Sequence, residues 1–373
     1  MKLRFEPLEK LCAAAVEDGT VPGLVLLAAS GGEVRYHQAF GARQLVPRKL
    51  PAFRDTLYDV ASLTKAVVTS VIAMHEAAAG RIGLAARVVE LVPEFAGPDP
   101  GRDQVTVRHL LCHASGLPAH RPLSRRARGG GGAFGRQTVL ELAAREPLEA
   151  PPGTRAVYSD LGFIVLGWLL ERSAGARLDM LAARVVTHPL GLGSTTFLAL
   201  DDVVARARWL GDRSFAATQH CPDRGHVLLG EVDDLNAAAM GGVAGHAGLF
   251  STAADLSAIA AALVRAFRGD AGPGALVERD VVRTFWSPSG IAGSTWRLGW
   301  DGPAAGHSQA GTRIARDAVG HLAFTGCSLW IDPGRETWIV LLSNRVHPAV
   351  PNDDRFKRFR PALHDAVLDA IEY

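Results

Sequence analysis

The sequence predicts a mixed α/β fold of the α+β type, in which both ends of the chain form one antiparallel sheet and helices lie between them. Runs with the composition of strands occur near both termini, whereas the middle of the chain carries helical periodicity. One sheet flanked by helices, with an inserted helical lobe, accommodates both observations. At 373 residues the chain is too long for one ordinary domain. We therefore predict an α/β sheet domain from residues 1–80 and 291–373, and a mainly helical domain from residues 81–290.

The N-terminal segment predicts a helix, two strands and a second helix, in that order. Residues 1–20 place four apolar side chains on one helical face: Leu8, Leu11, Cys12 and Val16. The next segment, GLVLLAASGGEVRYHQAFGARQ, has two β-rich runs on either side of Ser30, Gly31 and Gly32, which is typical of a hairpin. Residues 60–79 then form a helix that ends at Gly80, because glycine readily adopts the conformation that terminates helices.

The remaining elements follow from the same patterns. Helical runs in the middle of the chain are VRHLLCH, QTVLELAARE, SDLGFIVLGWLLERSAG and STAADLSAIAAALVRAFRG. Near the C-terminus, HLAFTGCSLWID and ETWIVLLSN are β-rich and are separated by a turn at Pro333-Gly334-Arg335. Residues 360–372 are predicted as a terminal helix. Residues 129–132 are four consecutive glycines, which predict a surface loop or, alternatively, a flap over a cleft.

Charge and composition exclude several classes of function. Lys and Arg total 40 and Asp and Glu total 38, so the net charge of +2 gives no electrostatic signature of a nucleic acid or membrane partner. No apolar stretch reaches the length of a membrane span, and Glu6, Glu9 and Lys10 interrupt the only early apolar region. The four cysteines are scattered, which is typical of reduced thiols. We expect a cytoplasmic enzyme without a metal or cofactor, and the oligomeric state is left open.

The first candidate catalytic feature is Ser62-Leu63-Thr64-Lys65 at the start of a predicted helix. The spacing from i to i+3 puts the hydroxyl and the amine on one helical face. A serine becomes a nucleophile when a base removes its proton, and a lysine can do so if burial lowers its pKa. The alternative is that Ser62 caps the helix and Lys65 is solvated, because S-x-x-K alone is a weak motif.

Two further features, at residues 158–160 and 320–326, are weak evidence alone and indicate a catalytic site only together with the first. Tyr158 and Asp160 lie where a proline- and glycine-rich segment meets an apolar helix, so the tyrosine hydroxyl can enter a cleft and act as a base. The alternative is packing by Tyr158 and helix capping by Ser159 or Asp160. Residues 320–326, GHLAFTG, predict a strand near the C-terminus.

The order of these three features resembles the serine β-lactamase and penicillin-binding-protein superfamily. The closest resemblance is to the class C β-lactamase-like esterases, also called family VIII carboxylesterases. It covers nearly the whole chain: VRHLLCHASGLP is similar to the family's VRHLLTHTSGLP, and PPGTRAVYSDLGFIVLG is similar to its P-G-x-x-x-x-Y-S-[ND] block. The resemblance implies a β-lactamase/transpeptidase-like fold.

The resemblance also implies a role for each matching residue. Ser62 matches the nucleophile, Lys65 the lysine that assists it, and Tyr158 the tyrosine that relays the proton. Asp160 lies where many relatives have asparagine. His321 lies where β-lactamases have the lysine of K-T-G. Substrate and oxyanion contacts are then expected from Asp160, His321, Ala323 and Phe324, with the amides of Ser62 and Phe324 forming the oxyanion hole.

The differences from the family pattern indicate which class of substrate to expect. Leu322 and Ala323 replace the usual Thr and Gly of the strand triad, and Leu322 has no hydroxyl to hold the carboxylate of a β-lactam. We therefore expect a serine hydrolase that acts on small, short-chain esters, with a small-molecule ester or amide as its substrate and no nucleic acid or membrane partner. The alternatives are a β-lactamase or D-alanyl peptidase, an acyltransferase to an alcohol acceptor, and a non-catalytic binding homologue.

Other conspicuous residues are given structural roles. His109 and His113 have the spacing of a zinc helix, but Leu110 occupies the position of the glutamate in H-E-x-x-H. His246, close to glycines on both sides, is expected to stabilise a loop, and the alternative is a position near the cleft. Three tryptophans are expected to fill the core near the sheet, with Trp300 an alternative wall of the acyl pocket: Trp296, Trp300 and Trp330.

Overall fold

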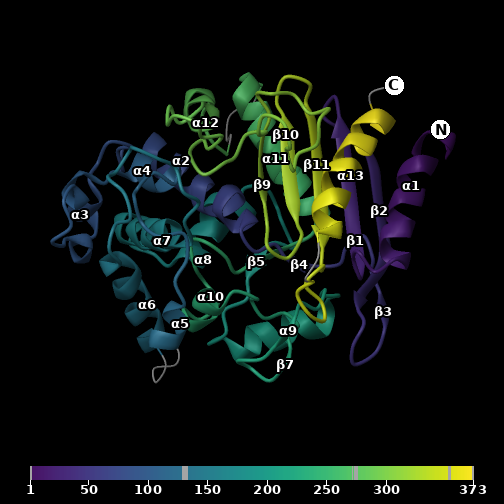
Figure 1. Ribbon diagram of the computed structural model, residues 1–373, viewed down its shortest axis with the longest axis horizontal. Helices are drawn as coiled ribbons and strands as arrows, with labels where there is room; N and C mark the ends of the chain where they lie inside the picture. The colour runs from purple at the N-terminus through teal and green to yellow at the C-terminus, as the bar shows by residue number, and fades with distance from the viewer. Residues whose placement is uncertain (1, 128–132, 271, 273–275, 352–353, 372–373) are drawn as a thin grey trace.

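The fold is a six-stranded antiparallel sheet with helices on both faces and a helical region beside it (Figure 1). The computed structural model describes residues 2–127, 133–270, 272, 276–351 and 354–371. The order of strands in the sheet is β3-β2-β1-β11-β10-β9. Their bounds are β1 Gly23–Ser30, β2 Glu33–Gln44, β3 Leu50–Pro51, β9 Val319–Leu322, β10 Ser328–Asp332 and β11 Thr337–Ser343. The predicted fold class is confirmed.

The pairing of β1 with β11 joins the two ends of the chain at the centre of the sheet. Leu24 lies opposite Ser343, and Ala29 lies opposite Trp338. The side chains of β1 alternate between the two faces, so Leu24, Leu26 and Ala28 pack on one side and Val25, Leu27 and Ala29 on the other. A central strand that is buried on both faces therefore appears as a continuous apolar run in the sequence.

Helices cover both faces of the sheet. On one face lie α1 (Lys2–Glu17) and α13 (Arg355–Ile371), which are adjacent in Figure 1, and on the other lies α11 (Ala253–Arg268). The predicted hairpin at Gly31 and Gly32 is confirmed. Both glycines have positive φ, 60° and 77°, as the two-residue turns favoured between twisted strands require.

The region beside the sheet is mostly helical, as expected for residues 81–290. Its helices are α3 Val88–Leu91, α4 Val107–Leu111, α5 Leu123–Arg126, α6 Ala133–Arg145, α7 Asp160–Ala174, α8 Leu178–Ala182, α9 Val203–Asp212, α10 Leu235–Ala239 and α12 Arg279–Trp286. Short 3₁₀ segments cover Pro93–Phe95 and Arg102–Gln104, and a π-helix covers Ala183–Thr187. The division into two domains stays a prediction, because one apolar core extends from the sheet into this region.

The structure also contains small sheets that the sequence did not predict. One has the order β4-β8-β5 and the other pairs β6 with β7. Their strands are β4 Tyr58–Asp59, β5 Thr196–Phe197, β6 His220–Cys221, β7 His226–Val227 and β8 Leu249–Ser251. Strands of two or three residues are too short to show an alternating pattern.

Three predicted elements differ from the observed ones. The helix predicted over 60–79 begins later, with a π-helix at Lys65–Ser70 followed by α2 (Val71–Ala78). The segment 321–332 is two strands rather than one, because a turn separates β9 from β10. The last helix begins at Arg355 rather than at residue 360. No described helix has both the length and the apolar composition that crossing a bilayer needs. Residues 129–132 lie outside the described residues.

Candidate active site

Ser62 lies in a tight turn between the short strand β4 and the π-helix that begins at Lys65. Ala61, directly before it, has a φ of 42°, an uncommon conformation for a residue with a side chain. Lys65 is completely buried, and the apolar neighbours Leu63, Ala66 and Val67 are also buried. The sequence around Ser62 therefore presents the hydroxyl in a strained turn and places the amine in the interior beside it.

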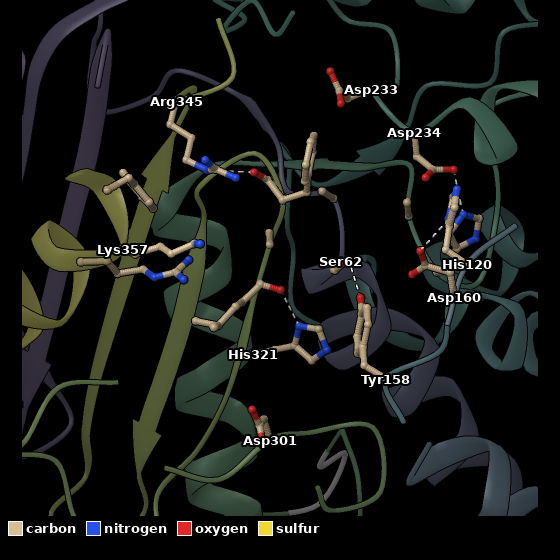
Figure 2. A pocket seen from close by; sticks show the side chains of 18 of the residues that line it. Ser62, His120, Tyr158, Asp160, Asp233, Asp234, Asp301, His321, Arg345 and Lys357 are labelled. Carbon is tan, nitrogen blue, oxygen red and sulfur yellow. Dashed lines mark hydrogen bonds and ion pairs between the residues drawn. The ribbon is translucent and has the colours of Figure 1, made fainter. Parts of the chain in front are cut away.

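Ser62 Oγ accepts hydrogen bonds from two polar side chains. The Tyr158 hydroxyl donates one over 2.7 Å (Figure 2). Lys65 Nζ donates the other over 3.2 Å. Lys65 Nζ has two further acceptors, Asp160 Oδ1 at 2.8 Å and the backbone carbonyl of His246 at 2.9 Å. An ammonium group has three protons to donate, so these contacts use all of them.

The N-terminus of α7 positions Tyr158 and Asp160. Ser159 is the N-cap: its Oγ accepts the amide proton of Gly162 at 3.0 Å and donates its own proton to the carbonyl of Pro118. The amide of Ser159 is bonded to His113 Nδ1 at 3.0 Å. Ser159 thus caps the helix while Tyr158 before it bonds to Ser62 and Asp160 after it bonds to Lys65, so the capping role and the site role coexist.

Lys65, Tyr158 and Asp160 shift one another's pKa values. Burial lowers the pKa of Lys65, but Asp160 and Tyr158 outweigh burial, and the net pKa is raised. Burial raises the pKa of Tyr158, and Asp160 raises it further against the opposing effect of Lys65. The pKa of Asp160 is lowered well below its ordinary range, since Lys65 and His120 overcome the effect of burial. The condition under which Lys65 would act as the base, a pKa lowered by burial, is therefore not met, because an anion lies 2.8 Å from the amine.

His321 enters the cavity from β9 as a neutral ring. Burial and the nearby Lys65 lower its pKa to about 3. Its Nδ1 is 2.7 Å from the carbonyl of Leu322, so Nδ1 carries the proton and Nε2 is left as an acceptor. Nε2 is buried and has no hydrogen-bond partner among the described residues. The position occupied by a cation in the K-T-G motif is therefore uncharged in this chain.

After β9, the amide of Ala323 is hydrogen-bonded and the amide of Phe324 is free among the described residues. Ala323 donates its N–H to the carbonyl of Cys327 at 2.8 Å, and its carbonyl accepts the N–H of Gly326 at 3.1 Å, so neither backbone group is free for a substrate. Within the described part of the chain, the amides of Ser62 and Phe324 have no acceptor. These two N–H groups are the pair that the sequence assigned to the oxyanion hole.

A cavity of 670 Å³ surrounds these groups and has two differently charged ends (Figure 2). We call one end the acidic end; it is lined by His120, Asp160, Asp233, Asp234 and His246. We call the other the basic end; it is lined by Arg345, Phe356, Lys357 and Arg360. Ser62, Tyr158, His321, Ala323 and Phe324 line the wall between them. Every residue that the sequence named for catalysis or substrate contact lines the cavity, except Lys65, which lies buried behind Ser62.

The tryptophans divide between cavity and core. Trp296 lines the cavity and stacks on Tyr158, with ring centroids 5.5 Å apart and planes inclined by 25°. The expectation that Trp296 fills the core is therefore wrong. Trp300 and Trp330 are buried and do not line the cavity, so the alternative of Trp300 as an acyl-pocket wall is excluded in this structure.

Sequence reasoning missed His120 and gave the cleft only as the alternative position for His246, which lines the cavity. His120 Nδ1 lies 3.3 Å from Asp160 Oδ2, and its pKa is raised, chiefly by that hydrogen bond. His246 Nε2 lies 2.8 Å from Asp234 Oδ1, while its carbonyl holds Lys65. A lone histidine in a loop carries no local pattern, and these partners are distant in sequence.

The described residues contain no group of three or more histidine, cysteine or acidic side chains placed to hold a metal ion. His109 Nδ1 instead accepts the amide proton of Thr106 at 3.3 Å, and His113 Nδ1 accepts that of Ser159. Both histidines of the zinc-like spacing therefore stabilise backbone.

Known proteins resemble this chain over nearly its whole length. A putative D-alanyl-D-alanine carboxypeptidase of Escherichia coli strain K12 is 29% identical over 377 residues, covering 94% of this chain and 85% of the relative. An N-acetylmuramyl-L-alanine amidase of Bacillus subtilis strain 168 is 28% identical over 381 residues, covering 94% and 84%. The solved structure of EstCE1, described as a hydrolase with promiscuous acyltransferase activity, has a TM-score of 0.75 at 22% identity and covers 98% of both chains.

These similarities confirm the resemblance at the level of the superfamily, whereas the closer assignment to class C β-lactamase-like esterases stays a prediction. The solved structure shows the fold alone, because its sequence identity is low. The family model described as Beta-lactamase, by contrast, matches residues 8–362. The chain therefore belongs to the beta-lactamase family of serine hydrolases.

Proposed function

We propose that the chain is a serine hydrolase that forms an acyl-enzyme on Ser62 and acts on small, short-chain esters. The observation that carries this proposal is the hydrogen-bonded cluster around Ser62 Oγ, with Tyr158 at 2.7 Å and Lys65 at 3.2 Å. A hydroxyl that contacts two titratable groups at the wall of a cavity has the geometry of an activated nucleophile.

Catalysis begins with the loss of one proton from the Tyr158–Lys65 pair. Both side chains donate to Ser62 Oγ in the structure, so neither is a base until a proton leaves. Tyr158 is the nearer group, and the ammonium of Lys65 lies 4.8 Å from the centre of its ring, which favours the phenolate. In the reactive form, the phenolate of Tyr158 accepts the proton of Ser62 while Oγ bonds to the carbonyl carbon.

The tetrahedral intermediate then needs hydrogen-bond donors for its oxygen and a proton for its leaving group. The amides of Ser62 and Phe324 are the donors, and each such donor typically contributes about 3–4 kcal/mol to the transition state. Tyr158 returns its proton to the departing alcohol as the C–O bond breaks. Water then attacks the acyl-enzyme by the same route, and Ser62 Oγ leaves with the proton that Tyr158 returns.

Leu322 supports an ester substrate over a β-lactam. It lines the cavity beside His321 and offers an apolar surface where a hydroxyl is usual in β-lactamases. The neutral His321 beside it cannot supply the cation of the K-T-G lysine. Esters need neither contact, and their leaving group requires less protonation than an amine.

Hydrolysis of p-nitrophenyl butyrate by the wild type and by Ser62→Ala tests this proposal. We expect the variant to lose about 10³-fold or more in kcat, as nucleophile removal does in other serine hydrolases, while its circular dichroism and melting temperature stay close to those of the wild type. Electrospray mass spectrometry of the wild type with a slowly hydrolysed ester locates the acyl group. Undiminished turnover by Ser62→Ala would contradict the assignment.

Amides or esters that carry a carboxylate are a second candidate class of substrate. Arg345 and Arg360 line the basic end of the cavity, and neither has a carboxylate partner among the described residues. The relatives named as a D-alanyl-D-alanine carboxypeptidase and an N-acetylmuramyl-L-alanine amidase favour the same class. A substrate carboxylate at the basic end would leave the scissile carbonyl free to reach Ser62.

A further inference from the structure

Asp59 is a fully buried carboxyl group that lies behind the active-site wall and does not line the cavity. It is the last residue of β4, three positions before Ser62. Burial, reinforced by Asp233, raises its pKa to about 7. A carboxyl group is seldom completely buried unless its oxygens are hydrogen-bonded, so the partners of Asp59 indicate what it does.

Each carboxyl oxygen of Asp59 accepts one backbone amide from a segment of the active site. Oδ1 accepts the N–H of Ala61 at 2.8 Å, and Oδ2 accepts the N–H of Asp233 at 2.7 Å. Ala61 is the residue with positive φ that directly precedes Ser62. The bond from Ala61 therefore holds the turn that presents the amide of Ser62. The bond from Asp233 connects this turn to the acidic end.

The backbone of Asp59 reaches the opposite side of the oxyanion hole. Its carbonyl accepts the hydroxyl proton of Thr325 at 2.9 Å, and both groups are completely buried or nearly so. Thr325 directly follows Phe324, the other residue with a free amide. A single residue thus contacts the neighbours of both amides that are proposed to bind the oxyanion.

We propose that Asp59 is a positioning residue that sets the separation and direction of the Ser62 and Phe324 amides. This inference rests on the proposed function, because it assigns a support to the proposed oxyanion hole. The physical reason is that Ala61 adopts its uncommon conformation at a cost in free energy, which the surrounding contacts must overcome. Without the bond from Asp59, the turn is free to relax and to rotate the Ser62 amide away from the oxyanion.

The test compares Asp59→Ala with the wild type by three measurements. Burst titration with p-nitrophenyl butyrate counts competent sites, steady-state kinetics gives kcat and KM per competent site, and inhibition by ethylboronic acid reports affinity for a tetrahedral adduct on Ser62. We expect Asp59→Ala to lose about 10–100-fold in kcat per site, because displacement by about 1 Å costs this much, with a weaker boronate affinity and a smaller change in KM.

Thr325→Val and Asp332→Ala separate positioning from folding. Thr325→Val keeps the shape of the side chain and removes the hydroxyl, which bonds to the Asp59 carbonyl and, at 3.6 Å, to Cys327 Sγ, so we expect a smaller loss in the same two readouts. Asp332 is also a buried acceptor, of the amides of Gly334 and Arg335 at 3.1 Å, but it lies in the turn that joins β10 and β11. We expect Asp332→Ala to lower stability and leave kcat per site unchanged.

The outcomes distinguish the inference from the proposed function. An active wild type with unchanged kcat and boronate affinity per site in Asp59→Ala would overturn the positioning role. A loss in Asp332→Ala equal to that in Asp59→Ala would do the same, because general destabilisation would then explain both. A wild type without turnover or boronate binding would instead overturn the proposed function. If Asp59→Ala does not fold, Thr325→Val alone decides, since a normal kcat there contradicts the inference.

Discussion

The two ends of the active-site cavity differ in how their charges are balanced. At the acidic end, Asp160 is paired with Lys65 and His120, and Asp234 is paired with His246. At the basic end, Lys357 is paired with Asp354 at 2.7 Å. The two arginines have no carboxylate partner within the described residues: the guanidinium of Arg345 bonds to the carbonyl of Phe324 at 3.0 Å, and that of Arg360 bonds to Gln309. Burial, together with the charge of Arg345, lowers the pKa of Arg360 to about 10.

This difference indicates a division of labour. Buried charges that neutralise one another hold protons and geometry inside the protein, and they have little attraction left for a ligand. Buried cations without an anion have already lost part of their hydration, so an arriving carboxylate gains strong hydrogen bonds at a low further cost. The acidic end therefore fits proton handling next to Ser62, and the basic end fits contact with the substrate.

The largest expected effect is on stability, and it differs in size between the two ends. Lys65→Met removes the main partner of a buried carboxylate, so we expect the free energy of unfolding to fall by about 3–5 kcal/mol. Arg360→Met removes a buried cation that repels Arg345, so the loss of its bonds to Gln309 should cost about 1 kcal/mol or less. Urea unfolding of both variants at pH 7 measures the difference. Equal losses would show that the two ends are balanced alike.

The second effect is on the charge preference of the substrate. Mono-p-nitrophenyl succinate places a carboxylate on the acyl chain, and an acyl ester of 4-hydroxybenzoate places one on the leaving group. For whichever position the basic end recognises, we expect the ratio of kcat/KM between charged and neutral esters to fall by about 10–100-fold in Arg345→Gln, because a charge-assisted bond is lost. Using a ratio cancels any effect through the Phe324 carbonyl that Arg345 holds.

Arg358→Gln is the matched control for this measurement. Arg358 is on the same helix as Lys357 and Arg360, but it is exposed and does not line the cavity. We expect its ratio to equal that of the wild type. A similar fall of the ratio in both variants would mean that the overall electrostatic field of the protein, rather than contact with Arg345, causes the effect. A wild type that prefers neutral esters at both positions of the carboxylate would exclude the second candidate class of substrate.

The sequence predicted the features that depend on local pattern. The hairpin between β1 and β2 followed from two adjacent glycines, and α7 followed from an apolar helical run after a capping serine. The break between β9 and β10 was missed, because residues 323–327 belong to an apolar, β-rich segment and turn only where Ala323 bonds to Cys327. Composition alone does not distinguish such a turn from a continuous strand.

The family resemblance predicted which residues form the candidate site, but the sequence did not predict their charge states. Family resemblance brought Ser62, Lys65 and Tyr158 together, and the structure places them within hydrogen-bond distance. The direction of the Lys65 pKa shift could not be predicted, because its partner Asp160 is 95 residues away and the distance between them is a tertiary property. The pairing of His246 with Asp234, and the lack of a carboxylate partner for Arg345 and Arg360 among the described residues, also depend on tertiary packing, for which no local pattern exists.

The smallest expected effect concerns the acid limb of the pH–activity profile, and it tests what the acidic end contributes. The charge of Asp160 raises the pKa of both Lys65 and Tyr158, so the proton that must leave before catalysis leaves only at higher pH. Asp160→Asn removes that charge and keeps an oxygen to accept from Lys65, so the acid limb of kcat/KM should move to lower pH by about one unit. Asp160→Ala shares the loss of charge but leaves Lys65 without this acceptor, so it should show the same shift with a lower maximum. A limb that stays in place in Asp160→Asn would mean that Asp160 holds Lys65 in position without setting its charge, and the contrast between the two ends would then lie in geometry alone.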